Sequence, residues 1–215
     1  MDLHLSSTQK IETGAQPVMD DHRRIHPGWL RLMHGLNALA VLILVGSGWR
    51  IYNASPLFGF EFPGVITLGG WLGGALNWHF AAMWLLAVNG LLYLLVNLVS
   101  GRLWHRFFPL SFHALFVDLR DALHGHLSHA DPRRYNMVQK AAYLFVMLDS
   151  VLLVISGLVL WKSVQFPLLG ELLGGYETAR YIHFFAMSAL VGFLVIHVAM
   201  ALLVPRSLLA MIRGR

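Results

Sequence analysis

The sequence predicts an all-α integral membrane protein, a bundle of four membrane-spanning helices. First, 57% of the 215 residues are hydrophobic and only 13% are charged, which is too apolar for a soluble domain of this size. Second, four apolar runs are long enough to cross a bilayer. Third, the basic residues flank these runs and form no separate patch, so the net charge of +5 does not indicate a nucleic-acid partner.

The two ends of the chain lie outside the expected membrane domain, residues 28–205. Residues 1–27 are polar, and no apolar signal core follows Lys10, so we expect a flexible cytoplasmic tail that is not cleaved. Residues 206–215 form a basic C-terminus. The absence of cysteine excludes disulfides, thiolate-held iron–sulfur clusters and covalently attached c-type haem.

The first span is predicted over about 29–52, where no charge occurs between Arg31 and Arg50. His34 stands at its beginning. Gly48 follows fourteen residues later on nearly the same helix face, where a flat porphyrin could approach the backbone.

The second span is predicted over about 77–99 and follows a Gly- and Pro-rich segment, 53–76. We expect that segment to form an interfacial or re-entrant loop that could receive a partner. His79 stands in the first predicted turn of the span. Gly90, eleven residues further on, again leaves that face flat.

A polar connection, 102–136, precedes the third span, and its part Leu110–Leu123 has the spacing of a short helix on the membrane surface. A solvated loop explains its histidines better than a metal site, because no cysteine or carboxylate pattern accompanies them. These histidines are His105, His113, His124, His126 and His129.

The third span is predicted over 137–161, with Asn136 as its N-cap. Asp149 near its middle must face the bundle interior, where it could transfer protons or hydrogen-bond a cofactor or a neighbouring helix. A short Gly-containing loop, 162–180, leads to the last span.

The fourth span, 181–204, is uncharged and carries two histidines, His183 and His197. Fourteen residues of helix separate them by about 21 Å along the axis and roughly 40° around it. One helix face therefore offers an imidazole near each membrane surface.

The distribution of Lys and Arg predicts the orientation. Thirteen of the sixteen lie before the first span, in 102–140 or at the C-terminus, so both termini and the long connection are expected in the cytoplasm. His34 and His197 then lie near the cytoplasmic surface, and His79 and His183 near the opposite surface.

Four histidines matched in depth favour two b-type haems, each held non-covalently by two imidazoles. A lone histidine in a membrane helix is more often a hydrogen-bonding residue. Two imidazoles occupy both axial positions of an iron, which points to one-electron transfer and leaves no position for oxygen. Arg31 and Arg180, each three residues before a predicted ligand, could neutralise haem propionates or anchor helix ends at the headgroups.

The chain resembles the bacterial cytochrome b561-like family, which includes cytochrome b subunits of nickel–iron hydrogenases, formate dehydrogenases and relatives that accompany periplasmic molybdenum enzymes. The likeness rests on RLMHGLNALAVLILVGSGW, the His79 helix, RYNMVQKAAYL and the two-histidine fourth helix, within residues 29 to about 205. It implies an inner-membrane subunit with two b haems that exchanges electrons between a periplasmic redox partner and quinone. It also implies the pairing of His34 with His197 and of His79 with His183, and a quinone pocket near Asn136 and Gln139.

The segment WLGGALNWHF is similar to the branch that serves molybdopterin enzymes, which we therefore expect as partners in preference to hydrogenase. Two other classes stay open: a stand-alone quinone-linked cytochrome such as a superoxide oxidase, and a haem-free anchor whose histidines only bond other helices. The direction of electron flow and a homodimer are not decided by the sequence.

Overall fold

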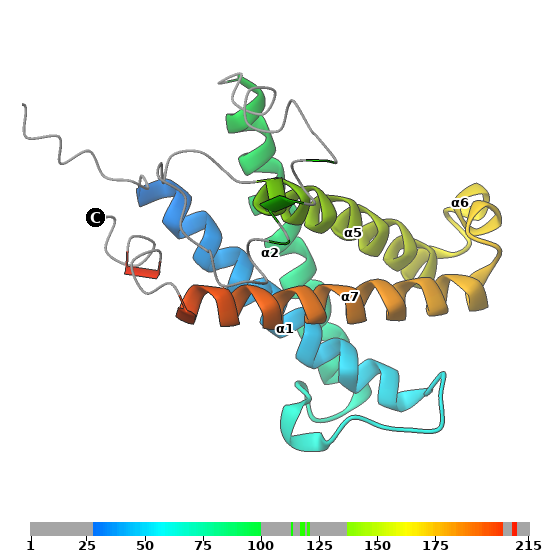
Figure 1. Cartoon of the computed structure of the whole chain (residues 1–215). Coiled ribbons are helices and arrows are strands. Elements are labelled where there is room, and N and C mark those ends of the chain that lie inside the picture. The colour runs from blue at the N-terminus through cyan, green and yellow to red at the C-terminus, as the bar shows by residue number, and fades with distance from the viewer. Residues whose placement is uncertain are drawn as a thin grey trace, which may run out of the picture.

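The computed structural model describes residues 28–99 and 137–203, together with positions 113, 117, 118, 120, 208 and 209 (Figure 1). In this part of the chain all regular structure is helical, and four helices are long and apolar enough to cross a membrane. This confirms the predicted all-α membrane fold. The four are α1 (Gly28–Ala54), α2 (Leu72–Val99), α5 (Met137–Lys162) and α7 (Tyr176–Leu203).

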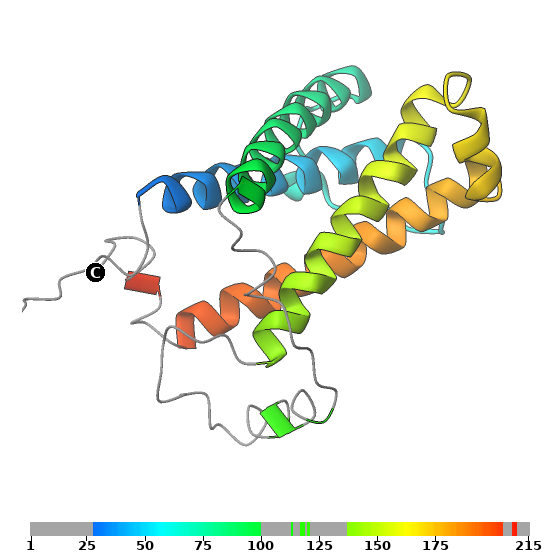
Figure 2. The same ribbon diagram turned by 90° about the horizontal axis from the view of Figure 1, so that it is seen from above.

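The four helices form two hairpins. In the first hairpin α1 lies against α2, and in the second α5 lies against α7 (Figure 2). The end of each hairpin that carries its connecting loop is called here the loop end, and the opposite end the termini end. Figure 1 shows a short helix, α6 (Pro167–Leu172), in the loop of the second hairpin.

Small residues line the contacts within each hairpin and recur every seven residues. This spacing brings them to one face of each helix and lets the backbones approach closely, as is usual where helices pack without a hydrophobic driving force between them. The buried residues of this stripe are Ala40 and Ser47 on α1, Ala75, Ala82 and Asn89 on α2, Asp149 and Ser156 on α5, and Ala179 and Ala186 on α7.

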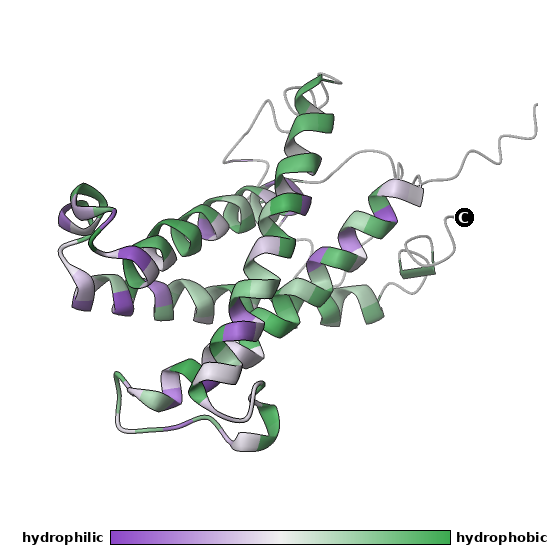
Figure 3. Cartoon of the chain, turned by 180° about the vertical axis from the view of Figure 1, so that it is seen from behind, coloured by the Kyte–Doolittle hydropathy of each residue, from purple (hydrophilic) through white to green (hydrophobic). Residues whose placement is uncertain are grey.

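The long helices are hydrophobic along most of their length (Figure 3). Large side chains such as Leu42, Leu91 and Val195 are at least 60% exposed. Inside a membrane such side chains contact lipid tails, so the low burial of this chain agrees with a multi-pass membrane protein.

Two helices begin earlier than their sequence pattern predicted. Helix α2 starts at Leu72 and α7 at Tyr176, because each follows a pair of glycines with positive φ that turns the chain directly into the helix. The pairs are Gly69–Gly70 (φ 107° and 71°) and Gly174–Gly175 (φ 78° and 93°). His79 therefore lies seven residues into α2 and not in its first turn.

The loop between α1 and α2 is fixed to the end of α1. The Asn53 side chain donates to the Phe62 carbonyl at 2.8 Å and accepts from the Phe62 N–H at 2.9 Å. The Leu68 N–H donates to the carbonyl of Gly46 at 2.9 Å, where a Cβ on that glycine would lie 3.3 Å from the Leu68 Cβ. The segment expected to be an irregular loop is irregular up to Trp71, apart from one 3-10 turn, Gly64–Ile66.

The connection between the hairpins is described only at positions 113, 117, 118 and 120, which are helical. These positions fall within the predicted surface helix, and His113 is exposed. The Asp118 carboxylate accepts the N–H of Met137 at 2.6 Å, at the first residue of α5. Asn136, the predicted N-cap, lies outside the described residues, as do His105, His124, His126 and His129.

Candidate functional site

The structure brings His34 and His197 together at the termini end. Their ring centroids lie 6.1 Å apart with an interplanar angle of 67°, although α1 and α7 belong to different hairpins. The His197 ring also stacks on Phe193, with centroids 5.6 Å apart. Both residues are exposed within otherwise apolar helices.

The separation of these two rings suits a shared metal ion. An ion bound at about 2 Å by one nitrogen of each ring would place the centroids roughly 6 Å apart, because a ring nitrogen lies about 1 Å from its centroid. The observed separation of 6.1 Å agrees with this. The arrangement therefore fits bis-imidazole ligation of a haem iron, while iron binding itself stays a prediction.

His79 is held at the loop end of the first hairpin by α1. Its Nδ1 lies 3.0 Å from the Ser47 Oγ, and the ring is also hydrogen-bonded to the carbonyl of Leu44. The next residue on α1, Gly48, lies under the ring edge, so that a Cβ there would be 3.6 Å from the His79 Cε1. The flat position predicted at Gly48 thus faces an imidazole directly.

His183 is held in the same way in the second hairpin. Its Nδ1 lies 2.9 Å from the Ser156 Oγ on α5, and the carbonyl of Leu153 is a second acceptor. A Cβ at Gly157 would be 3.4 Å from the His183 Cε1. His183 lies seven residues after the start of α7, as His79 does after the start of α2. The two hairpins therefore present their loop-end histidines at equal depth.

His79 and His183 both lie toward the loop end, one in each hairpin. Each of the two histidine pairs thus joins one residue of the first hairpin to one of the second. The contact of His34 with His197 agrees with the pairing that depth predicted from the sequence. The pairing of His79 with His183, and the role of all four as ligands, remain predictions.

Ser47, Ser156 and Gly157 were not predicted from the sequence. The signal that could have found them is the dipeptide Ser-Gly, which occurs in the second half of both the first and the third predicted span. A comparison of those two spans would have shown this recurrence. Only the packing of each hairpin shows that the dipeptide faces a histidine.

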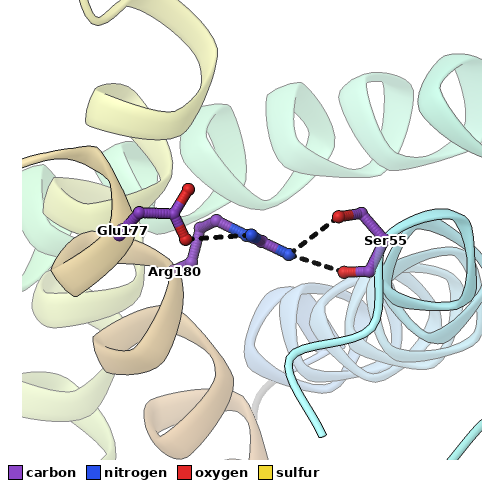
Figure 4. Close-up of polar contacts among 3 residues, drawn as sticks. All are labelled: Ser55, Glu177 and Arg180. Carbon is purple, nitrogen blue, oxygen red and sulfur yellow. Dashed lines mark hydrogen bonds and ion pairs between the residues drawn. The ribbon is translucent and has the colours of Figure 1, made fainter.

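The predicted propionate partners occupy different surroundings. The Arg180 guanidinium bonds the Glu177 carboxylate at 3.0 Å and both the carbonyl and the hydroxyl oxygen of Ser55 (Figure 4). This joins the start of α7 to Ser55, the residue that follows the end of α1. Arg31 is partly buried and has interactions of its own. A propionate contact for either residue stays a prediction. Anchoring at the lipid headgroups, the other predicted role, also stays a prediction.

The remaining predicted positions are spread over the helices. A Cβ at Gly90 would meet no atom within 4 Å, so the helix face there is open. Gln139 is exposed in the first turn of α5 and makes interactions within the chain, while its predicted companion Asn136 is not described. Asp149 is 7% exposed, and its Oδ2 has no hydrogen-bond partner in the structure.

Two comparisons with known proteins give a match. A family model described as prokaryotic cytochrome b561 matches residues 25–214. A protein of Azospira oryzae named "Putative protein-methionine-sulfoxide reductase subunit YedZ1" is 68% identical over 190 residues, which cover 88% of this chain and 96% of that protein. No solved structure matches the chain.

Proposed function

The chain belongs to the prokaryotic cytochrome b561 family, and on that premise we propose that it is the membrane subunit of a reductase, carrying electrons from quinol to a partner protein. The observation that supports this proposal most directly is the pairing of histidines across the two hairpins, at 6.1 Å between ring centroids for His34 and His197. Such pairing at two depths provides a ligand set near each end of the membrane domain.

In this proposal His34 and His197 hold one b-type haem, and His79 and His183 hold a second. Bound haem supplies reversible one-electron oxidation and reduction. The chain's own contribution would be two imidazoles to hold each haem iron. The apolar helices exclude water from the ligands.

The partner is proposed from the relative's name, which makes that protein a subunit of a protein-methionine-sulfoxide reductase. For a partner of this class the electrons run from quinol to the sulfoxide. Quinol oxidation releases two electrons and two protons. Reduction of methionine sulfoxide consumes two of each and gives methionine and water, so the reaction balances.

We propose that the partner protein docks at the loop ends of the two hairpins. Most Lys and Arg residues lie toward the opposite, termini end, which predicts that the loop ends face away from the cytoplasm. The loop between α1 and α2 presents Phe58 and Phe60, which are 37% and 46% exposed. The resemblance of WLGGALNWHF favours a molybdopterin-dependent partner. Quinone is placed near the termini-end pair, at Gln139 and Asn136, as the family resemblance implies.

The haem-to-protein ratio of the detergent-purified chain tests this assignment. Pyridine haemochrome analysis should give two b-type haems per chain, and His79→Ala and His197→Ala should each remove one. His113→Ala is the matched control, because this histidine is exposed in the connection and belongs to neither pair. A haem-free chain would contradict the proposal and leave a membrane anchor.

The partner and the direction of flow need a second measurement. Membranes containing the chain and its co-expressed partner should reoxidise quinol-reduced haem when a methionine-sulfoxide peptide is added. Membranes without the partner should not respond. Superoxide-driven haem reduction by the isolated chain, with no response to the sulfoxide, would instead indicate a stand-alone superoxide oxidase.

A further inference from the structure

Ser47 and Ser156 occupy equivalent places in the two hairpins. Both side chains are fully buried, and each lies within 3.0 Å of the Nδ1 of a histidine on the partner helix. Each is also followed by a glycine that lies under the ring edge of that histidine. The same three-residue arrangement, serine, glycine and histidine, therefore occurs once in each hairpin.

The direction of these hydrogen bonds follows from the hydroxyl proton. The Ser47 Oγ lies 2.6 Å from the carbonyl of Ile43, and the Ser156 Oγ lies 2.7 Å from the carbonyl of Leu152. A carbonyl can only accept, so each hydroxyl donates its proton to the preceding turn of its own helix. Each Oγ is then an acceptor toward the histidine.

The histidine must therefore carry its proton on Nδ1. A neutral imidazole has one protonated nitrogen and one with a lone pair. With Nδ1 donating to the serine, the lone pair lies on Nε2, which is the nitrogen free to bind a metal.

We propose that Ser47 and Ser156 are a pair of positioning residues that fix His79 and His183 as Nε2 ligands of the loop-end haem and increase their basicity. This proposal rests on the proposed function. A hydrogen bond from the outer ring nitrogen strengthens an imidazole as an electron donor to its metal. Loss of the hydrogen bond from the histidine to the serine makes the imidazole a weaker donor and stabilises ferric iron less. The midpoint potential of the haem is therefore expected to rise.

Redox titration and low-temperature EPR of the purified chain test the pair. Ser47→Ala and Ser156→Ala should each raise the midpoint potential of one haem component, and the double variant should raise it further. The second component should keep its potential. The affected component should be the one that His79→Ala removes.

Ser188→Ala is the matched control. Ser188 also donates to the carbonyl four residues earlier, that of Phe184, at 2.8 Å, but it is exposed on α7 and this bond is to backbone, not to a histidine. This variant should keep both potentials. Ser47→Thr retains the hydroxyl group, so the midpoint potential of the loop-end haem should stay close to that of the parent chain. This variant controls for a general packing defect as the cause of the shift in Ser47→Ala.

Two outcomes separate this inference from the function on which it rests. A parent chain without two haems would contradict the proposed function before the serines are considered. Two haems whose potentials and EPR signals are unchanged in the double variant would overturn the positioning role alone. An equal shift in Ser188→Ala would also overturn it, because the effect would then not depend on the histidine contact.

Discussion

At the residue scale, buried polar side chains mark the contacts between the helices of each hairpin. Ser47, Asn89 and Ser156 all have hydrogen-bond partners. The Asn89 amide donates to the carbonyl of Met33 at 2.8 Å and to the Asn37 side chain, beside His34. Asp149 differs, because its Oδ2 is buried and has no partner in the structure.

Replacement of Asp149 by leucine should stabilise the chain. An unsatisfied buried polar atom costs about 1–3 kcal/mol, and a leucine removes that cost. We expect a higher melting temperature in detergent for Asp149→Leu and a smaller change for Asp149→Asn, which keeps a polar group. Lower stability, or an altered haem spectrum, would show instead that the carboxylate holds a cofactor or a proton that the chain needs.

At the scale of elements, the loop between α1 and α2 is an ordered part of the first hairpin. Asn53 and Gly46 fix it to α1, and aromatic rings connect it to α7. The Phe58 and Phe184 centroids lie 5.2 Å apart, and those of Phe60 and Phe184 lie 6.4 Å apart. The surface proposed for partner docking is therefore held in place before any partner binds.

Asn53→Ala should loosen this loop while the membrane helices remain folded. It removes both hydrogen bonds to Phe62, and each such bond contributes about 1 kcal/mol. Limited chymotrypsin digestion should then cut near Phe58 and Phe60 several times faster. Thr67→Val is the control, because Thr67 bonds only Gly64 within the loop. Equal cleavage rates in all three chains would contradict the role given to Asn53.

At the scale of the whole molecule, side-chain contacts join the two hairpins at both ends and between them, in addition to the aromatic contacts of the loop with α7. Arg180 bonds Ser55 at the loop end, Phe80 lies against Trp161 with centroids 5.1 Å apart, and His34 meets His197 at the termini end. Among the described helices, most close backbone contacts lie within a hairpin. The chain thus consists of two helical hairpins, and each proposed haem site takes one histidine from each hairpin.

Arg180→Ala should therefore weaken the association of the hairpins more than Glu177→Ala does. The glutamate pair lies within α7 and is exposed, so it contributes less than about 1 kcal/mol, whereas the Ser55 contact joins the two hairpins. Thermal unfolding in detergent should show a larger decrease for Arg180→Ala. If the two variants unfolded alike and only Arg180→Ala changed a haem potential, a propionate contact would explain Arg180 better.

The sequence by itself determined the class of the protein, its four membrane helices and the four histidines at two depths. These properties follow from composition and from the 3.6-residue period, which are local. The exact starts of α2 and α7 were missed, because paired glycines are typical of loops and only the folded chain shows a turn leading directly into a helix.

Only the tertiary structure decided which serines and glycines hold His79 and His183, and how the loop lies on α1. Helices in a membrane are not paired by hydrophobicity, since lipid is as apolar as their side chains. Close packing of small residues and a few polar bonds selects the partners instead. Ser47 and His79 are 32 residues apart in the chain, so no local pattern could predict their contact.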